Sequence, residues 1–377
     1  MENDMHTALF NTGWPLALVL ALLAGPATAA PADEVALIER HALAEAQAPV
    51  RERADWRALR KIVVADMEPG RLDWLRQGLP ADVHIVGARN AAEALEQVTD
   101  ADALIGFCSE ELLERGVDLV WVQVLVAGVE SCVDLPAMQA RQPLLTNMQR
   151  VTGPVIAEHV MALTLALARA LPDYQRAQDA ERWDREAPAP RGPMSLEGRR
   201  LLVVGLGGIG IEVARRAHAF GMEVHAVRAS RPEGPEFVAR VVLPEGLAAE
   251  LAEADVVVNA LPLTPETEGQ FDRAMFEAMP AHALFINVGR GGTVVTADLV
   301  AALEEGLIGG AGIDVTEPSP LPSGHPLWRA PNTLITPHVA ARSELGFAVR
   351  WEVVRANLRR YLEGEPMLSV VDLERGY

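Results

Sequence analysis

Three glycines in the second half of the chain have the type and spacing that a phosphate-binding turn needs. Gly205, Gly207 and Gly210 form the pattern G-x-G-x-x-G between an apolar run at 201–205 and a helix expected over 211–220. The first glycine allows a tight turn, the second lets a pyrophosphate approach the backbone, and the third lets helix and strand pack closely. Free N–H groups at the helix N-terminus then bind phosphate oxygens. The pattern predicts a dinucleotide site, the alternative being a glycine-rich turn without a ligand. The residues expected at this site are Gly205, Gly207, Gly208, Ile209 and Gly210.

The loop after the next apolar run indicates which dinucleotide binds. An NAD site usually has an acidic residue ~20 residues beyond the glycines, where it holds the ribose 2′-hydroxyl. Here Arg228 stands 18 residues after Gly210, and no carboxylate occurs on the loop before Glu233. The guanidinium groups of Arg228 and Arg231, together with the Ser230 hydroxyl, can hold a 2′-phosphate through paired donors. We therefore predict NADP(H) as the preferred cofactor, with NAD(H) as a second possibility; a solvated basic turn is the alternative.

Two series of apolar runs of strand length must position these residues. The first series comprises 61–66, 83–88, 103–107 and 121–128; the second comprises 201–205, 222–227, 255–260, 283–289 and 308–315. Polar stretches with helical spacing separate the runs, which indicates parallel sheets covered on both faces. The Pro-rich stretch 187–193 connects the two series. Two α/β units leave a cleft between them, a common place for a ligand.

Composition and charge exclude several classes of protein. The 377 residues suffice for about two domains of ~100–200 residues, and the 50% hydrophobic and 23% charged content argues against general disorder. A net charge of -19 excludes nucleic acid as a partner, because such binding needs a basic surface. Lys61 is the only lysine, so a P-loop is excluded. Cys108 and Cys132 are too few for a disulfide scaffold and have no neighbours at zinc spacing, so no metal site is expected.

The N-terminus has the pattern of an export signal. An uncharged apolar run of 11 residues at 14–24 precedes an A-x-A cleavage pattern at 27–29, whereas a membrane span needs ~20 apolar residues. Glu2 and Asp4 depart from the basic start that signal peptides usually have. We predict a signal peptide over 1–30 and export to the periplasm; the alternative is a cytoplasmic chain with a frayed extension or a wrongly chosen start.

The remaining unassigned segments are expected to be helical. Residues 31–57 are rich in Ala, Glu and Arg and predict a helical extension. The apolar stretch 155–171 contains Glu158, His159 and Arg169 and is expected to be a buried helix, so no membrane span is predicted in the mature chain.

Several further stretches follow one another in a recognisable order. They are AGVES at 127–131, the stretch 146–169, NALPLTPETEG at 259–269, NVGRGG at 287–292, GIDV at 312–315 and the stretch 321–340. Together with the glycine pattern, this order resembles the D-isomer-specific 2-hydroxyacid dehydrogenases, and most closely their glyoxylate/hydroxypyruvate reductase branch. The resemblance runs from about Lys61 to Leu362.

The resemblance implies an α/β fold of two doubly wound parallel-sheet domains. A Rossmann nucleotide domain, 152–338, is expected to be inserted into a flavodoxin-like substrate domain, 58–151 and 339–377. The family also implies a homodimer and a small 2-keto or 2-hydroxy acid as the substrate.

The resemblance implies an arginine and a histidine as catalytic residues. Arg290, in N-x-x-R-G, matches the arginine that holds the carboxylate and carbonyl oxygens of the substrate, a task suited to a planar, permanently charged fork. His338, in T-P-H, matches the histidine that exchanges a proton with the substrate oxygen. The unperturbed pKa of histidine, ~6.5, suits both directions of such a reaction.

The third catalytic residue of the family, a glutamate, is missing from its usual position. The family reads D-V-x-x-x-E-P-L-P, but the residue five positions after Asp314 is Ser319. Glu317 lies two residues earlier and is the candidate replacement, although Pro318 and Pro320 stiffen its loop.

Weaker matches concern two loops. Ala127, Gly128 and Val129 match a loop whose backbone N–H groups meet the substrate carboxylate, and Thr264 matches a loop beside the cofactor. The chain is therefore predicted to transfer hydride between NADP(H) and a small 2-keto/D-2-hydroxy acid. The alternative, favoured by Ser319, is a nucleotide-binding sensor or partner-binding module with weakened or lost catalysis.

Overall fold

Five short parallel strands form the first sheet of the computed structural model, which describes residues 31–66, 68–187 and 192–374. The strands are β1 (Lys61–Ala65), β2 (His84–Ala88), β3 (Ala103–Ile105), β4 (Trp121–Gln123) and β5 (Leu144–Thr146), in the order β2-β1-β3-β4-β5. Its helices are α2 (Arg71–Arg76), α3 (Ala91–Gln97), α4 (Glu110–Arg115), α5 (Glu130–Val133) and α6 (Pro136–Arg141). The strand order is that of a flavodoxin-like doubly wound sheet.

Seven parallel strands form the second sheet, in the order β12-β11-β10-β9-β6-β7-β8. They are β6 (Arg200–Val204), β7 (Glu223–Val227), β8 (Arg240–Val242), β9 (Val256–Asn259), β10 (Leu284–Asn287), β11 (Gly310–Ile313) and β12 (Thr333–Ile335). The strand order reverses between β6 and β9, and ligands of open α/β sheets bind outside the carboxyl ends of the strands at such a point.

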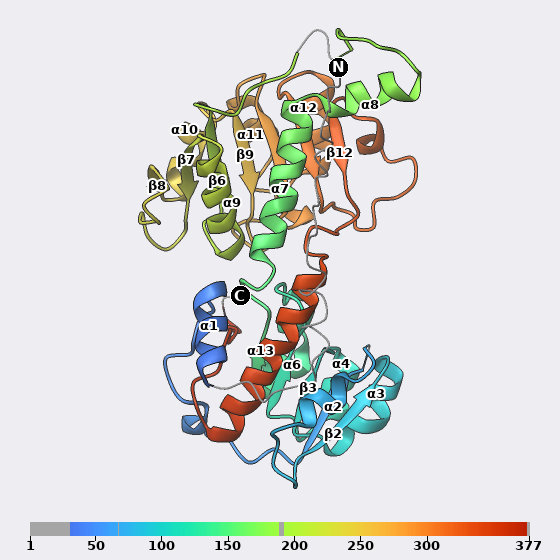
Figure 1. The fold of residues 1–377 in the computed structure, drawn as a ribbon, viewed down its shortest axis with the longest axis vertical. Helices are drawn as coiled ribbons and strands as arrows, with labels where there is room; N and C mark the ends of the chain where they lie inside the picture. The colour runs from blue at the N-terminus through green and yellow to red at the C-terminus, as the bar shows by residue number, and fades with distance from the viewer. Residues whose placement is uncertain (1–30, 67, 188–191, 375–377) are drawn as a thin grey trace, which may run out of the picture.

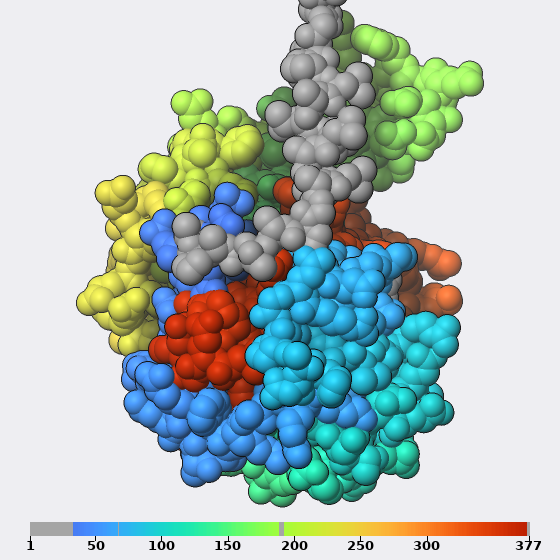
Figure 2. Space-filling view, turned by 60° about the horizontal axis from the view of Figure 1, so that its bottom comes forward, coloured from blue at the N-terminus to red at the C-terminus, as the bar shows by residue number. Residues whose placement is uncertain are grey.

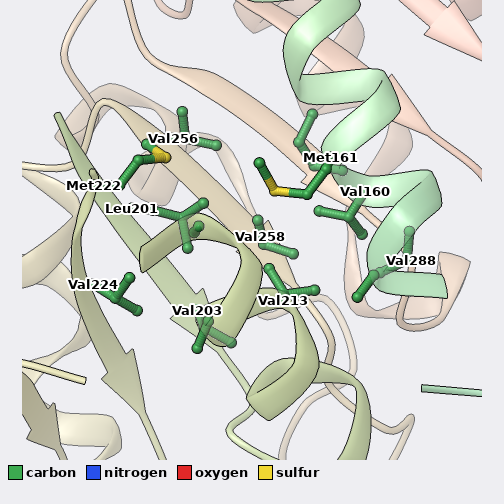
Figure 3. Close-up of a cluster of buried hydrophobic side chains, with 14 of the residues drawn as sticks. Val160, Met161, Leu201, Val203, Val213, Met222, Val224, Val256, Val258 and Val288 are labelled. Atoms are coloured by element: carbon green, nitrogen blue, oxygen red, sulfur yellow. The ribbon is translucent and has the colours of Figure 1, made fainter. Parts of the chain in front are cut away.

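Helices cover both faces of the second sheet. They are α7 (Gly153–Ala168), α9 (Gly208–Ala219), α10 (Leu247–Leu251), α11 (Arg273–Ala278) and α12 (Thr296–Glu304). Helix α8 (Leu171–Asp179) follows α7 and projects away from the sheet (Figure 1). Figure 3 shows Val160 and Met161 of α7 and Val213 of α9 packed on the valines and leucines of the strands. A second cluster, which includes Phe276 of α11 and Phe285 of β10, fills the opposite face. These two apolar layers hold the carboxyl ends of the strands in fixed positions.

The long apolar helix predicted over 155–171 is α7, which runs from Gly153 to Ala168 and is largely buried. Within the described ranges, no individual helix has both the length and the apolar character that a membrane crossing requires. Helices α7 and α8 reach that length and apolar character only as a pair, and the chain bends by 67° between them.

The last helix returns to the first sheet, so the second sheet is inserted into the first domain. Helix α13 (Glu344–Glu363) begins at Ser343, whose hydroxyl accepts from the N–H of Gly346. The ring of Tyr361 stacks on Trp121 of β4 at 5.5 Å, and Asn357 donates to Gln123 at 2.9 Å. Figure 1 shows the two halves of the molecule one above the other, with α13 in the lower half. This confirms the predicted fold class.

The N-terminal segment is helical over a shorter range than predicted. Helix α1 spans Pro31–His41, and Ala42 then adopts a left-handed φ of 47° that ends it. The following residues pair with the C-terminal segment: the N–H of Ala46 donates to Met367 at 2.8 Å, and that of Val50 to Glu365 at 3.0 Å. The predicted signal segment, 1–30, lies outside the described residues.

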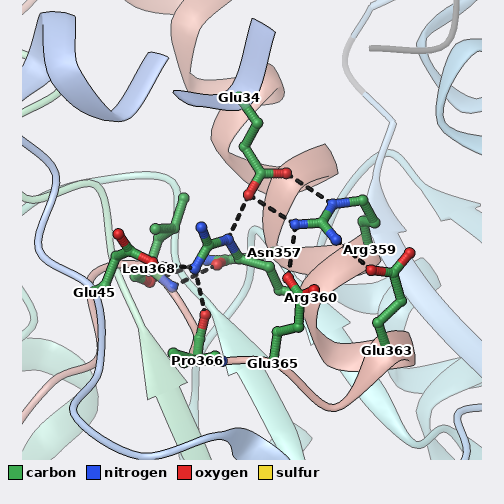
Figure 4. A network of polar contacts seen from close by, with 9 residues as sticks. All are labelled: Glu34, Glu45, Asn357, Arg359, Arg360, Glu363, Glu365, Pro366 and Leu368. Atoms are coloured by element: carbon green, nitrogen blue, oxygen red, sulfur yellow. Dashed lines mark hydrogen bonds and ion pairs between the residues drawn. The ribbon is translucent and has the colours of Figure 1, made fainter. Parts of the chain in front are cut away.

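A network of arginines and glutamates anchors this segment to α13 (Figure 4). The buried Glu34 accepts hydrogen bonds from Arg360 at 2.6 Å and from Arg359 at 2.8 Å. Burial favours the neutral form of Glu34, but the two arginines outweigh it and lower the pKa of this carboxyl. Figure 2 shows the red surface of α13 bordered by the blue N-terminal segment. The N-terminal segment is therefore part of the first domain's packing.

Candidate active site

The glycine turn joins β6 to α9, and this helix begins at Gly208, three residues before its predicted start. Gly205 has φ 101°, and a Cβ there would lie 2.8 Å from the carbonyl oxygen of Ala260, after β9. At Gly210 a Cβ would lie 2.2 Å from the carbonyl oxygen of Gly205, so only glycine permits this approach of helix and strand. A Cβ at Gly207 would meet no described atom within 4 Å. The turn therefore leaves open space at the N-terminus of α9, which fits a bound pyrophosphate.

Several arginines lie close to the glycine turn, two of them on the loop that follows β7. Arg228 follows the strand directly and donates to the carbonyl oxygen of Glu233 at 3.2 Å, while Ser230 and Arg231 lie exposed on the same loop. Burial lowers the pKa of Arg228, and the positive charges of Arg231 and Arg150 lower it further. Concentrated positive charge at this position fits a 2′-phosphate. Arg150 was not singled out in the sequence, because it lies 78 residues before Arg228.

The carboxyl ends of β6, β9 and β10 form one continuous edge. The loop after β9 is closed by the N–H of Thr264, which donates to Thr267 Oγ1 at 2.8 Å. A Cβ at Gly289 would lie 2.6 Å from the carbonyl oxygen of Leu261 in the same loop. The predicted cofactor loop and the loop that carries Arg290 are therefore in direct contact.

Arg290 reaches from the second domain to the predicted substrate loop of the first. Its Nη2 atom would lie 1.9 Å from a Cβ placed on Gly128, so the guanidinium rests directly against this glycine. The Arg290 Nε atom donates to Glu130 at 2.8 Å, and Nη1 donates to the carbonyl oxygen of Gly289 at 2.8 Å. Asn147 donates to the carbonyl oxygen of Ala127 at 2.8 Å and so holds this loop in place. The structure thus brings Arg290 together with Ala127–Val129.

The backbone of Arg290 is held by a set of buried amide and hydroxyl groups. Its carbonyl oxygen accepts from Thr293 Oγ1 at 2.7 Å. Asn259 donates to Thr293 Oγ1 at 2.7 Å and to Asn287 Oδ1 at 3.1 Å, which links the ends of β9 and β10. Asn259 and Asn287 are both fully buried. They position Arg290 through its backbone and do not contact its guanidinium.

His338 is positioned by the buried carboxylate of Asp314. The N–H of His338 donates to the carbonyl oxygen of Asp314 at 2.9 Å, and its φ is 54°. The carboxylate itself accepts from Thr336 Oγ1 at 2.6 Å and from the N–H groups of Val339 and Ala340 at 2.9 and 3.1 Å. The His338 side chain is exposed, and it makes no hydrogen bond to any other described residue. The buried carboxylate thus organises the turn and leaves the imidazole accessible.

The structure does not join Glu317 to His338. Glu317 and Ser319 lie exposed on the loop after β11, and no ion pair between Glu317 and His338 occurs in the described part of the chain. The backbone carbonyl of Glu317 accepts from Thr296 Oγ1 at 2.7 Å, which ties this loop to α12. The role suggested for Glu317 therefore stays a prediction.

A disulfide lies beside the substrate loop. Cys108 lies after β3, and Cys132 lies in α5, three residues after Val129. A disulfide joins the two cysteines across a sequence separation of 24. The sequence alone did not predict this bridge, because two cysteines so far apart show no framework pattern. Glu130, the carboxylate partner of Arg290, was also missed, since its pairing depends on a contact across 160 residues.

The fold and the site define a dinucleotide-dependent oxidoreductase with two α/β domains. Residues 161–340 match the family model of the D-isomer specific 2-hydroxyacid dehydrogenase, NAD binding domain. The human glyoxylate reductase/hydroxypyruvate reductase is 32% identical over 291 residues, which is 75% of this chain and 88% of the human protein. Glyoxylate/hydroxypyruvate reductase B of Klebsiella pneumoniae is 35% identical over 256 residues, 66% of this chain and 77% of that protein.

A solved structure shows the same arrangement. The NADPH-dependent glyoxylate/hydroxypyruvate reductase of Sinorhizobium meliloti, in complex with NADP and sulfate, superposes with a TM-score of 0.73 at 28% identity, covering 84% of this chain and 99% of that one. The chain belongs to the D-isomer specific 2-hydroxyacid dehydrogenase family, in its glyoxylate/hydroxypyruvate reductase branch. It is accordingly an oxidoreductase that acts on CH–OH donors.

Proposed function

We propose that the protein reduces a small 2-keto acid of the glyoxylate or hydroxypyruvate type with NADPH. This proposal rests mainly on the contact between the Arg290 guanidinium and Gly128. The contact places a fixed cation beside the backbone N–H groups of the substrate loop. Such a site suits a small carboxylate with an adjacent carbonyl oxygen. The NADP and NADPH complexes of relatives, together with Arg228, Ser230 and Arg231, favour the phosphorylated cofactor over NADH.

Each residue of the proposed active site has its own role in the reaction. Arg290 binds the carboxylate and polarises the carbonyl oxygen of the substrate, while the N–H groups of Gly128 and Val129 orient the carboxylate. The nicotinamide, when bound, supplies the hydride that the carbonyl carbon accepts. Protonated His338 gives its proton to the carbonyl oxygen, so that the ketone becomes an alcohol. In the oxidative direction neutral His338 takes the hydroxyl proton.

The test is turnover of glyoxylate and hydroxypyruvate by the purified protein with NADPH and with NADH. We expect reduction of both acids, with kcat/KM at least tenfold higher for NADPH. Tight NADPH binding without turnover of either acid would favour the alternative function, a sensor or partner-binding module, which Ser319 at the usual glutamate position supports.

Placing a carboxylate at residue 319 is expected to change the pH dependence of reduction. A carboxylate beside an imidazole favours the charged form of the ring. Reduction uses that charged form and is lost as pH rises, so Ser319→Glu should move this loss to higher pH. The measurement is kcat/KM for hydroxypyruvate against pH.

Glu317→Gln is the matched control, and it should leave the profile of the natural protein nearly unchanged. An unaltered profile in Ser319→Glu, together with a collapse of activity in Glu317→Gln, would show that Glu317 already serves as the partner of His338.

We also propose that the protein is exported and acts in an oxidising compartment. Support comes from the signal-like pattern at 1–30 and from the Cys108–Cys132 disulfide, because such bridges persist outside the reducing cytoplasm. We expect the native protein to begin near Ala30 or Pro31, in the periplasmic fraction, and to show no free thiol after denaturation. N-terminal sequencing and thiol labelling test this; an intact Met1 or Met5 with two free thiols in the cytoplasmic fraction would refute it.

The homodimer expected from the family stays a proposal. Helix α8 and the residues that follow it project from the upper half of the molecule in Figure 1. Trp183, which follows α8, is 93% exposed, and tryptophan is among the residues enriched at protein–protein interfaces.

A further inference from the structure

Arg150 lies in the turn that enters α7, and its backbone conformation is unusual for its residue type. Its φ is 71°, in the left-handed region that glycine adopts readily and that other residues reach at a cost. Non-glycine residues in this region are often found at functional sites, where the surrounding structure holds them. The left-handed conformation of Arg150 therefore suggests that its side chain has a functional role.

The side chain of Arg150 packs directly on the glycine turn. A Cβ at Gly208, the first residue of α9, would lie 2.8 Å from Arg150 Cγ and 3.2 Å from its Cα. The N-termini of α7 and α9 also meet, since a Cβ at Gly153 would lie 3.0 Å from the carbonyl oxygen of Gly208. The arginine thus reaches the end of α9 where the glycine pattern binds a pyrophosphate.

The guanidinium of Arg150 retains donors for a ligand. Its Nη1 atom donates to the carbonyl oxygen of Ala42 at 2.8 Å, so the residue that ends α1 orients the group. Its Nε atom is buried and has no hydrogen-bond partner within the described part of the chain. A guanidinium has five N–H donors, and a phosphate oxygen can accept from those that remain.

Electrostatics favours an anion at the same place. Arg150 is close enough to Arg228 to act on its ionisation, together with Arg231. A phosphate bound near these arginines and the positive end of α9 would offset the repulsion that Arg228 experiences. The carboxylate of Glu212 in α9 accepts from Arg216 at 2.6 Å, so its negative charge is already paired.

We infer that Arg150 is a further cofactor ligand, which binds the pyrophosphate of the dinucleotide and is held in place by the N-terminal segment. Its contact with Gly208, at the start of α9, assigns it to the pyrophosphate, whereas Arg228, Ser230 and Arg231 serve the 2′-phosphate. This inference rests on the proposed nicotinamide-dinucleotide function. The N-terminal segment thereby acquires a role in cofactor binding in addition to its packing on α13.

The test measures cofactor binding without turnover, from the fluorescence of NADPH and of NADH titrated with the full-length protein. Arg150→Gly removes the guanidinium and suits the left-handed backbone, so the relief of backbone strain should offset the lost contacts and the unfolding temperature should change little. We expect its Kd to rise about tenfold or more for NADPH and NADH alike, because both contain the pyrophosphate. Arg150→Lys, which keeps a single charge, should lose less.

Arg228→Gln is the matched control, and it should raise the Kd for NADPH while leaving that for NADH unchanged. Unchanged Kd values in Arg150→Gly would overturn the inference, as would a loss confined to NADPH, which would move Arg150 to the 2′-phosphate. A natural protein that binds neither nucleotide would instead refute the proposed function itself.

Discussion

Replacing Arg290 by glutamine is expected to lower kcat/KM for hydroxypyruvate reduction by about 10²–10³-fold, the range seen when one preorganised donor to a developing oxyanion is removed. The side chain is held on both sides, by Glu130 at 2.8 Å and by the carbonyl oxygen of Gly289 at 2.8 Å, so it is fixed before substrate binds. Glutamine keeps two donors but has neither the charge nor the planar fork. The measurement is steady-state kinetics with NADPH saturating.

Three companion variants separate catalysis from charge balance. Arg290→Lys should recover only part of the activity, since it restores the charge without the fork. The double variant Arg290→Gln/Glu130→Gln should remain as slow as Arg290→Gln, because removing an unpaired carboxylate does not replace the lost donors. Arg329→Gln, at an exposed arginine of the same domain, should leave kinetics unchanged. Full recovery in the double variant would show that Arg290 serves only to neutralise Glu130.

Replacing His338 by asparagine is expected to lower kcat for reduction by about 10²–10⁴-fold, the usual contribution of a general acid. Asparagine tolerates the left-handed region better than most residues, which suits the φ of 54° at this position. The side chain is exposed, so the free energy of unfolding should change by no more than about 0.5 kcal/mol. NADPH binding should also be preserved.

The pH profile distinguishes loss of an acid from a structural effect. In His338→Asn the residual reduction rate should no longer fall with rising pH in the range where histidine titrates. His84→Gln, at an exposed histidine at the start of β2, is the matched control and should behave like the natural protein. A rate reduced less than tenfold, with the original pH dependence intact, would show that another group donates the proton.

Local patterns in the sequence determined a large part of this protein. The glycine spacing at 205–210 demanded a tight turn and close helix packing, and both Gly205 and Gly210 meet backbone atoms that exclude a Cβ. Alternating apolar and polar stretches predicted both parallel sheets, because a strand buried on both faces has to be apolar along its length. The order of motifs then identified the family, and with it the insertion that α13 completes on the first sheet.

Contacts between distant residues were decided by the tertiary structure alone. The helix predicted over 31–57 ends at His41, because the residues beyond it find partners near 365–369, more than 300 residues away. The pairing of Glu130 with Arg290, the Cys108–Cys132 bridge and the approach of Arg150 to Gly208 likewise join segments that no local pattern relates. The hydrophobic periodicity of a sequence shows which face of one helix or strand is buried. Which residues meet across two domains depends on how their complete surfaces pack. Those contacts are therefore decided only in the folded chain.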